Sequence, residues 1–193
     1  MNEGHLQFLA SAEWARMLEA DLLPWLVGVA DLGDDVLEVG PGPGLTTDLL
    51  RQRTAKLTAV ELDAELAAAL AARLAGTNVE VVHGDAIDAG LPADRFSAAT
   101  CFSTLHHIPS SDRQDRLFAE LYRVLHPGGA FIGVDAVDNE RIRQGHVDDV
   151  FVPVDPETLG ARLEATGFAN ACVEAGEYQL RFNATRPGTS IGP

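Results

Sequence analysis

Residues 36–47 read VLEVGPGPGLTT, and this stretch decides the fold. An apolar run typical of a buried strand ends at Gly40, and glycines recur at every second position, Gly42 and Gly44. A helical pattern begins immediately afterwards at Leu45. Glycine tolerates positive φ and lets a ligand approach the main chain. A strand, a glycine turn and a helix N-terminus in this order indicate a polar-ligand site at the carboxyl edge of a parallel sheet.

The glycine spacing excludes two common phosphate-binding motifs. The dinucleotide fingerprint needs its third glycine one residue later than Gly44. A P-loop ends in Gly-Lys-Ser or Gly-Lys-Thr, whereas Gly44 is followed here by Leu45 and Thr46. The loop therefore belongs to another kind of α/β ligand site.

Three more runs with strand character follow the glycine turn. The first, residues 57–61, ends in Glu61 about 20 residues after the turn, where an acidic side chain can accept hydrogen bonds from both hydroxyls of a ribose. The other two runs, each with the polar residues that follow it, are residues 79–83 with Asp85, and residues 96–102 with His106 and His107. The carboxyl ends of all these runs are expected at one edge of the sheet.

With residues 121–129 (LYRVLHPGG) added, these elements resemble class I S-adenosylmethionine-dependent methyltransferases, in the type 11 branch that acts on small molecules. The resemblance covers about residues 35–135. It implies an α/β fold, a Rossmann-like three-layer sandwich with a seven-stranded, mostly parallel sheet. An antiparallel C-terminal hairpin is expected at residues 168–175 and 177–184.

The resemblance also implies a cofactor, S-adenosyl-L-methionine, with S-adenosyl-L-homocysteine as product. Glu61 is expected at the ribose, Asp85 at the adenine amino group, and the backbone of Ala86 beside the ring. A plain turn role is the alternative for Asp85. Glu38 is expected near the methionine amino end, with support of the loop as its alternative. The expected cofactor-binding residues are Glu38, Gly40, Pro41, Gly42, Gly44, Glu61, Leu62, Asp85, Ala86 and Phe102.

Histidines 106, 107 and 146 are the candidates for catalysis. Histidine titrates near neutral pH and can act as a general base. The resemblance places His106 and His107 after the fourth strand, where the family presents catalytic side chains. Leu-His-His is also common in this branch across unrelated substrates, which favours a shaping role for one of the two. A metal site needs three or four convergent ligands. The sequence shows no convergence of His106 and His107 with His146, Asp148 or Asp149, and no metal is expected.

One domain is expected for 193 residues. It divides into an N-terminal helical segment (1–30), a Rossmann-like core (31–185) and a flexible tail (186–193). The segment 1–30 either covers the cofactor mouth or packs on the sheet for stability. Residues 136–150, which contain His146, lie where the family keeps a variable connection facing the substrate; a solvated loop is the alternative.

The charge of the chain excludes several classes of partner. Lys and Arg number 14 against 29 Asp and Glu, a net charge of −15. A nucleic-acid backbone needs a basic face, so no nucleic-acid partner is expected. The longest apolar stretch, around residues 22–30, is too short to span a bilayer. Two cysteines and no signal-peptide pattern favour a cytoplasmic location. The sequence does not fix the oligomeric state, and a homodimer is among the states considered.

The acceptor of the methyl group is expected to be a small molecule with an oxygen, nitrogen or sulfur nucleophile. The dimethyladenosine rRNA methyltransferases have a similar Gly-Pro-Gly loop, but their fourth motif is of an Asn-Leu-Pro-Tyr type. Residues 101–104 read CFST here, so the pocket for a flipped base is missing. A non-catalytic S-adenosylmethionine-binding module that regulates or scaffolds a partner is the alternative function, because its cofactor motifs would be the same.

Overall fold

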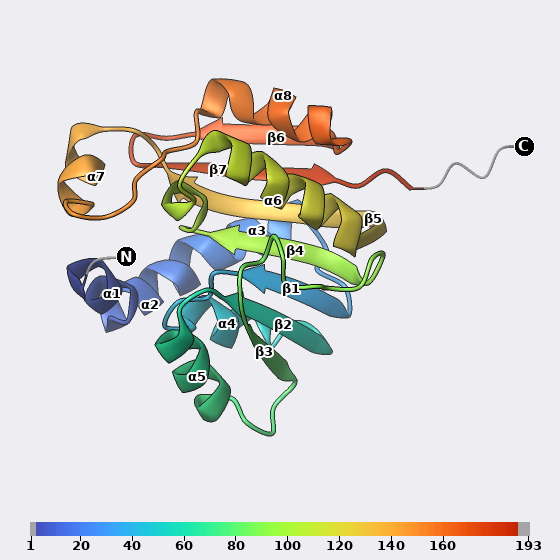
Figure 1. Cartoon of the computed structure of the whole chain (residues 1–193), viewed down its shortest axis with the longest axis horizontal. Coiled ribbons are helices and arrows are strands. Elements are labelled where there is room, and N and C mark those ends of the chain that lie inside the picture. The colour runs from blue at the N-terminus through green and yellow to red at the C-terminus, as the bar shows by residue number, and fades with distance from the viewer. Residues whose placement is uncertain (1–2, 189–193) are drawn as a thin grey trace, which may run out of the picture.

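The computed structural model describes residues 3–188. Its strands are β1 (Asp35–Val39), β2 (Lys56–Glu61), β3 (Val79–His83), β4 (Phe96–Phe102), β5 (Leu125–Ala136), β6 (Ala169–Ala175) and β7 (Gln179–Thr185). They form one seven-stranded sheet in the order β3-β2-β1-β4-β5-β7-β6 (Figure 1). Strands β1 to β5 run parallel, whereas β7 is antiparallel to both β5 and β6. The predicted fold class and the C-terminal hairpin are confirmed.

Five of the helices begin where the sequence supplies a capping side chain. They are α1 (Glu3–Leu9), α2 (Ala12–Met17), the π-helix η1 (Leu18–Leu22), α3 (Leu23–Val29), α4 (Leu45–Leu50), α5 (Ala64–Arg73), the 3₁₀ turn η2 (Leu105–His107), α6 (Ser111–Val124), α7 (Glu140–Gly145) and α8 (Pro156–Thr166). The side chains of Ser11, Asp63, Ser110, Asn139 and Asp155 each accept a hydrogen bond from the first turn of the helix that follows. None of the helices in residues 3–188 has both the length and the apolar character that crossing a bilayer requires.

Helices cover both faces of the sheet. Figure 1 shows α6 in front of the sheet and α3 behind it. On the α6 side, Phe118 of α6 packs with Phe131 of β5 and Phe182 of β7 in the larger core cluster. On the other side, Leu22 of η1 and Leu26 of α3 pack with Ile132 of β5. The alternation of side chains along each strand thus divides the apolar residues between two layers.

The parallel register brings the predicted site residues to one edge of the sheet. Val39 of β1 lies beside Val60 of β2 on one side and Cys101 of β4 on the other. Glu61 lies beside His83 at the ends of β2 and β3. The glycine turn and the segments that leave β2, β3 and β4 therefore emerge together, as expected for the ligand edge of an α/β sheet.

Strand β5 begins earlier than the sequence predicts. Pro127 to Gly129 is expected to break the helix and start the strand at Ala130, yet β5 already begins at Leu125, which pairs with Phe96. The irregular register between Phe96 and Ala98 accommodates the Pro-Gly-Gly segment within the strand. Residues 136–150 also differ from a plain connection, because they contain α7.

Arg186 anchors the C-terminal end of the described chain. Its N–H donates to Gly129 O at 2.8 Å, and its guanidinium pairs with Asp94 at 2.5 Å. These contacts hold Arg186 against the sheet and the end of α6, and the flexible tail (186–193) stays a prediction. The predicted tail residues 189–193 lie outside the described residues.

Gly133 in β5 provides a test of the β5–β7 pairing. A Cβ at this position would lie 2.2 Å from Cζ of Phe182 and 2.9 Å from Cys101 O. Because the core is close-packed, we expect Gly133→Ala to lower the free energy of unfolding by about 1–3 kcal/mol, measured by urea denaturation. Gly160→Ala in α8 is the control, since its Cβ would meet only Val173 at 4.0 Å. That change should raise stability by about 0.5–1 kcal/mol. Equal stability of Gly133→Ala and wild type would contradict the observed packing.

Candidate functional site

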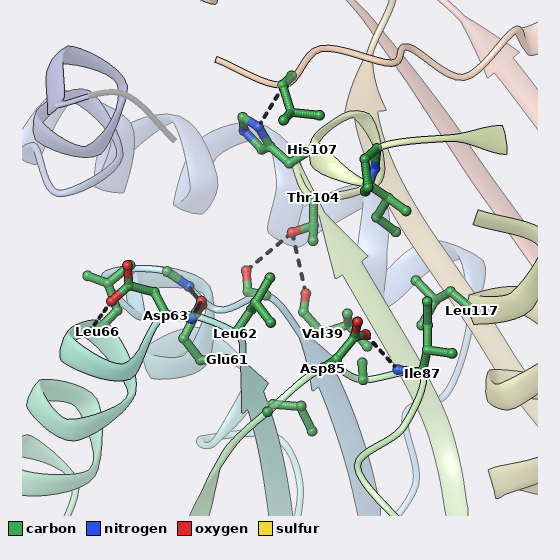
Figure 2. A pocket seen from close by; sticks show the side chains of 18 of the residues that line it. Val39, Glu61, Leu62, Asp63, Leu66, Asp85, Ile87, Thr104, His107 and Leu117 are labelled. Atoms are coloured by element: carbon green, nitrogen blue, oxygen red, sulfur yellow. Dashed lines mark hydrogen bonds between the residues drawn. The ribbon is translucent and has the colours of Figure 1, made fainter. Parts of the chain in front are cut away.

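A cavity of about 600 Å³ opens at the carboxyl edge of the parallel strands (Figure 2). This volume lies within the range of small-molecule sites in proteins. Six of the ten predicted cofactor residues line it, namely Gly40, Gly42, Glu61, Leu62, Asp85 and Ala86. Pro41 and Phe102 line a smaller cavity of about 30 Å³ that shares Gly40 and Gly42 with the first. Glu38 and Gly44 line neither of these two cavities.

The glycine turn allows close approach on both of its sides. Gly40 has φ +66°, and a Cβ there would lie 2.5 Å from Cγ2 of Thr104. Gly42 has φ +54°, and a Cβ there would meet nothing within 4 Å. Gly40 is therefore required for contact with the segment after β4. Gly42 leaves the wall of the cavity open to a ligand.

Glu61 links the end of β2 to the glycine turn. The residue is 7% exposed. Oε2 accepts a hydrogen bond from the Gly42 N–H at 2.9 Å, and Oε1 accepts one from the Asp63 N–H at 2.9 Å. A carboxylate has about four acceptor sites, so each oxygen retains capacity for a further donor from the cavity. Glu61 thus lies where the sequence predicts it, with acceptors that suit ligand hydroxyls.

Asp85 is engaged by a residue that the sequence did not indicate. Its Oδ1 accepts from the Ile87 N–H at 3.0 Å, and its Oδ2 accepts from the guanidinium of Arg113 in the first turn of α6. Both Asp85 and Arg113 line the cavity. A ligand amino group at Asp85 would share the carboxylate with Arg113. The adenine contact remains a prediction, and only the tertiary contact between the segment after β3 and the start of α6 reveals Arg113.

Glu38 lies beneath the glycine turn. It is 1% exposed, and its carboxylate accepts hydrogen bonds from the hydroxyls of Thr46 and Thr47 at the start of α4. Burial raises the pKa of Glu38 to about 7, against the lowering effect of the two hydroxyl donors. These contacts support the alternative that Glu38 holds the loop in place. Its contact with the cofactor remains a prediction.

Asp135, at the end of β5, organises the segment after β4. Its buried carboxylate accepts from the backbone N–H groups of Thr104 (3.1 Å), Leu105 (2.7 Å) and Ala136 (2.8 Å). It also lies 2.6 Å from Nδ1 of His106. Sequence reasoning missed this residue. The available signal was the one that identified Glu61, an acidic side chain at the end of a predicted strand.

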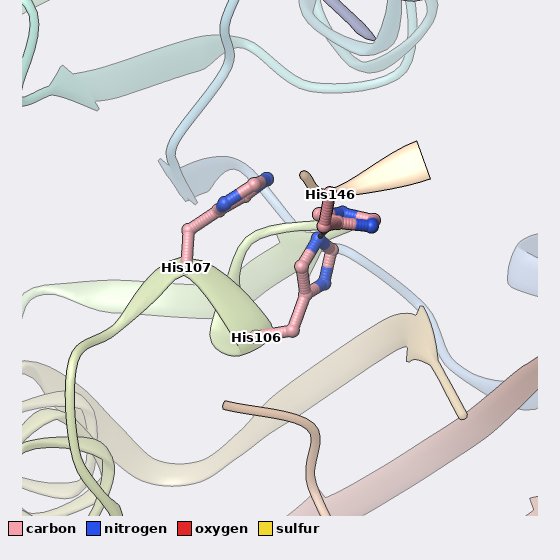
Figure 3. A group of neighbouring side chains, drawn as sticks. All are labelled: His106, His107 and His146. Carbon is pink, nitrogen blue, oxygen red and sulfur yellow. Dashed lines mark hydrogen bonds between the residues drawn. The ribbon is translucent and has the colours of Figure 1, made fainter. Parts of the chain in front are cut away.

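The structure brings the three predicted catalytic histidines together (Figure 3). Nε2 of His106 lies 3.1 Å from Nε2 of His146, and one ring nitrogen from each of the three residues lies within 4.8 Å of the others. His107 lines the main cavity, whereas His106 is 1% exposed. The fold supplies a convergence that the sequence did not show, because η2 and the end of α7 meet beside the cavity.

Comparisons with known proteins agree with the fold. A family model described as "Methyltransferase domain" matches residues 37–133. Among solved structures, an S-adenosylmethionine-dependent methyltransferase from Aquifex aeolicus superposes with a TM-score of 0.76 at 22% identity, covering 96% of this chain and 99% of that one. Phosphoethanolamine N-methyltransferase 2 from Haemonchus contortus, in complex with phosphomonomethylethanolamine and S-adenosylhomocysteine, gives 0.73 at 16% identity, covering 90% and 53%.

Two curated relatives are ribosomal RNA enzymes. Ribosomal RNA small subunit methyltransferase A from Deinococcus radiodurans is 48% identical over 69 residues, which cover 34% of this chain and 24% of that protein. A probable enzyme of the same name from Methanopyrus kandleri is 37% identical over 81 residues, 40% of this chain and 29% of that protein. The chain thus matches less than a third of the length of these relatives.

The raised pKa of Glu38 predicts a pH dependence of stability. Because its pKa is about 7 in the folded chain, against an ordinary value of 4.5, the folded chain binds more protons than the unfolded chain between these values. The contribution of Glu38 to the free energy of unfolding is therefore expected to be fully present below pH 4.5. It should be lost, by about 3 kcal/mol, as the pH rises through 7. Glu38→Gln should lose this component, which denaturation of both proteins from pH 4.5 to 8 would measure. Parallel pH profiles would contradict the burial of an ionisable Glu38.

Thr47→Val removes one of the two hydroxyl donors to Glu38. This change should move the pH at which stability is lost to a higher value, measured by the same denaturation series.

Proposed function

The chain belongs to the family of class I S-adenosylmethionine-dependent methyltransferases, and we propose that it transfers a methyl group to an oxygen, nitrogen or sulfur nucleophile of a small molecule. The observation that carries the proposal is the joint position of Glu61 and the glycine turn at the cavity. A buried carboxylate at the end of the second strand, held to a glycine without side-chain obstruction, suits a ligand with vicinal hydroxyls.

The residues present fit the cofactor. Glu61 would hold the ribose hydroxyls, and Asp85 with the backbone of Ala86 would hold the adenine. Pro41 and Phe102 flank the smaller cavity across the glycine turn, where the methionine portion of the cofactor would bind. Once bound, S-adenosylmethionine supplies an electrophilic methyl group on a sulfonium. The chain then needs only to align a nucleophile and, for a weak nucleophile, to accept a proton.

The cavity also supports a small acceptor. Leu6 of α1 and the residues Asp149 and Val150 line it together with the strand ends. The N-terminal segment and the segment after α7 therefore overhang the same edge of the sheet as the cofactor residues. Thr104 and His107, from the segment after β4, supply polar groups to the wall. His107 is the predicted catalytic histidine that an acceptor in this cavity would meet.

Charge argues against RNA as the acceptor, although the curated relatives act on ribosomal RNA by name. The net charge is −15. Many of the available cations already pair with carboxylates. The arginines in such ion pairs are Arg51, Arg73, Arg95, Arg113, Arg123, Arg143, Arg162, Arg181 and Arg186. A protein that binds a phosphate backbone needs cations that can replace counterions along it.

A regulatory or scaffolding module that binds the cofactor without turnover would share the same cofactor site. Incubation with S-adenosylmethionine labelled in its methyl group, against a panel of small amines, hydroxyl compounds and thiols, separates the two functions. We expect label in one class of acceptor, together with S-adenosylhomocysteine. Cofactor binding with no labelled product from any class would favour the module.

Glu61 is the residue whose change tests cofactor binding. We expect Glu61→Gln to weaken the binding of S-adenosylhomocysteine about 10- to 100-fold. The change replaces charge-assisted hydrogen bonds worth about 1.5–3 kcal/mol each. Isothermal titration calorimetry measures the change. Glu65→Gln in the exposed first turn of α5 is the matched control and should bind like wild type. Equal affinities of wild type and Glu61→Gln would place the ribose elsewhere.

If the acceptor is a small molecule, the chain should bind RNA only weakly and without sequence specificity. We expect fluorescence anisotropy with a labelled RNA hairpin to give a dissociation constant no tighter than about 10⁻⁴ M at physiological salt. Micromolar or tighter binding that weakens steeply with added salt would overturn the small-molecule proposal in favour of an RNA acceptor.

A further inference from the structure

Three imidazoles from two distant segments meet beside the cavity. His106 and His107 belong to η2 after β4, and His146 follows α7. The ring centroids are 4.1 Å apart for His106 and His107, and 4.9 Å apart for His106 and His146 (Figure 3). None of the chemistry proposed above requires all three rings.

The hydrogen bonds orient the three rings in the same way. Nδ1 of His106 lies 2.6 Å from the Asp135 carboxylate, which already accepts three backbone N–H groups and so acts as an acceptor toward the ring. Nδ1 of His146 lies 2.7 Å from Ile142 O. Nδ1 of His107 lies 3.1 Å from Val150 O. Carbonyl oxygens only accept, so Nδ1 is the donor in each neutral ring and Nε2 carries the lone pair.

This orientation is the one that metal-binding histidines adopt. Such residues almost always donate one ring N–H to a carboxylate or a backbone carbonyl, which fixes the tautomer and directs the other nitrogen to the metal. The lone pairs of His106 Nε2 and His146 Nε2 point at each other across 3.1 Å. Two bare lone pairs at this distance repel, so the contact needs either a shared proton or a cation between the two nitrogens.

We propose that His106, His107 and His146 bind one divalent transition-metal ion, with Zn²⁺ the best fit. Zn–N bonds of about 2.0–2.1 Å at tetrahedral angles separate two ligand nitrogens by about 3.3 Å, close to the His106–His146 distance. The three nitrogens lie within 4.8 Å of one another, so the widest pair must close by up to about 1.5 Å to reach tetrahedral spacing. Imidazole nitrogens are suitable ligands for Zn²⁺ and its neighbours in the transition series.

Charge and packing around the rings suit a dication. The carboxylate of Asp135 is buried against His106, and that of Asp149, 4% exposed, lies 3.7 Å from Nδ1 of His107. Two carboxylates thus lie beside the three rings, and negative charge at this position favours a bound cation. Phe151 packs against His146, with ring centroids 4.6 Å apart, and contributes an apolar wall on that side.

The position of His107 links the metal site to the cavity. Because His107 and Asp149 line the cavity, a three-histidine ion would keep a fourth coordination position near it. There it would bind the oxygen, nitrogen or sulfur atom of the acceptor and lower its pKa, as Zn²⁺ does for bound water. This role rests on the proposed function, whereas metal binding itself does not.

The test is metal titration of the full chain, prepared without a histidine tag and dialysed against a chelator. Zn²⁺ should bind at one equivalent by calorimetry, and Co²⁺ should develop the visible absorption of a four-coordinate nitrogen site. His106→Ala and His146→Ala should each lose the saturable site. Asp135→Asn, which retains the three rings, should bind about 10- to 100-fold more weakly. His126→Ala, a half-buried histidine bonded to Pro127 O outside the cluster, is the matched control and should bind like wild type.

The outcomes separate the metal site from the proposed function. Absence of one-equivalent binding by the wild type, or binding retained in both His106→Ala and His146→Ala, overturns the site. S-adenosylhomocysteine titrations of the same proteins report whether the variants remain folded. Metal binding without any cofactor binding would leave the metal site standing and sink the proposed function. Cofactor binding without any metal binding would overturn the metal site and leave the proposed function standing.

Discussion

The buried carboxylate of Asp135 is the interaction on which the arrangement of the site depends. By accepting from the backbone of Thr104 and Leu105, it fixes the turn that leaves β4. The Thr104 hydroxyl then contacts Gly40 O at 3.2 Å, which joins this turn to the glycine turn after β1. The same carboxylate orients His106. Without these acceptors, the segment after β4 would leave buried backbone donors unsatisfied, a cost of about 1–3 kcal/mol each.

Glu61 plays the equivalent part on the other side of β1. It binds the N–H of Gly42 and that of Asp63, as Asp135 binds the turn after β4. In both places an acidic residue at a strand end holds a neighbouring turn in position. A rigid framework of this kind lets turns, which carry the ligand contacts, keep a defined geometry. Carboxylates at two strand ends thus hold the turns at the cofactor edge of the sheet.

Local signals in the sequence predict the framework well. The glycine turn and the strand β4 appear in the structure where the sequence pattern predicts them. Contacts between segments far apart in the chain could not be predicted in this way. The pairing of Asp85 with Arg113 depends on how the segment after β3 meets the first turn of α6. The contact between His106 and His146 depends on α7. This helix is too short and too polar to be predicted from apolar periodicity.

The most direct test of the account is a crystal structure of the chain with S-adenosylhomocysteine. The account predicts electron density inside the cavity of about 600 Å³, with the ribose hydroxyls on Glu61 and the adenine beside Ala86. It further predicts that the Gly42 N–H stays bonded to the Glu61 carboxylate. A ligand bound outside this cavity, or a ribose with no contact to Glu61, would contradict it.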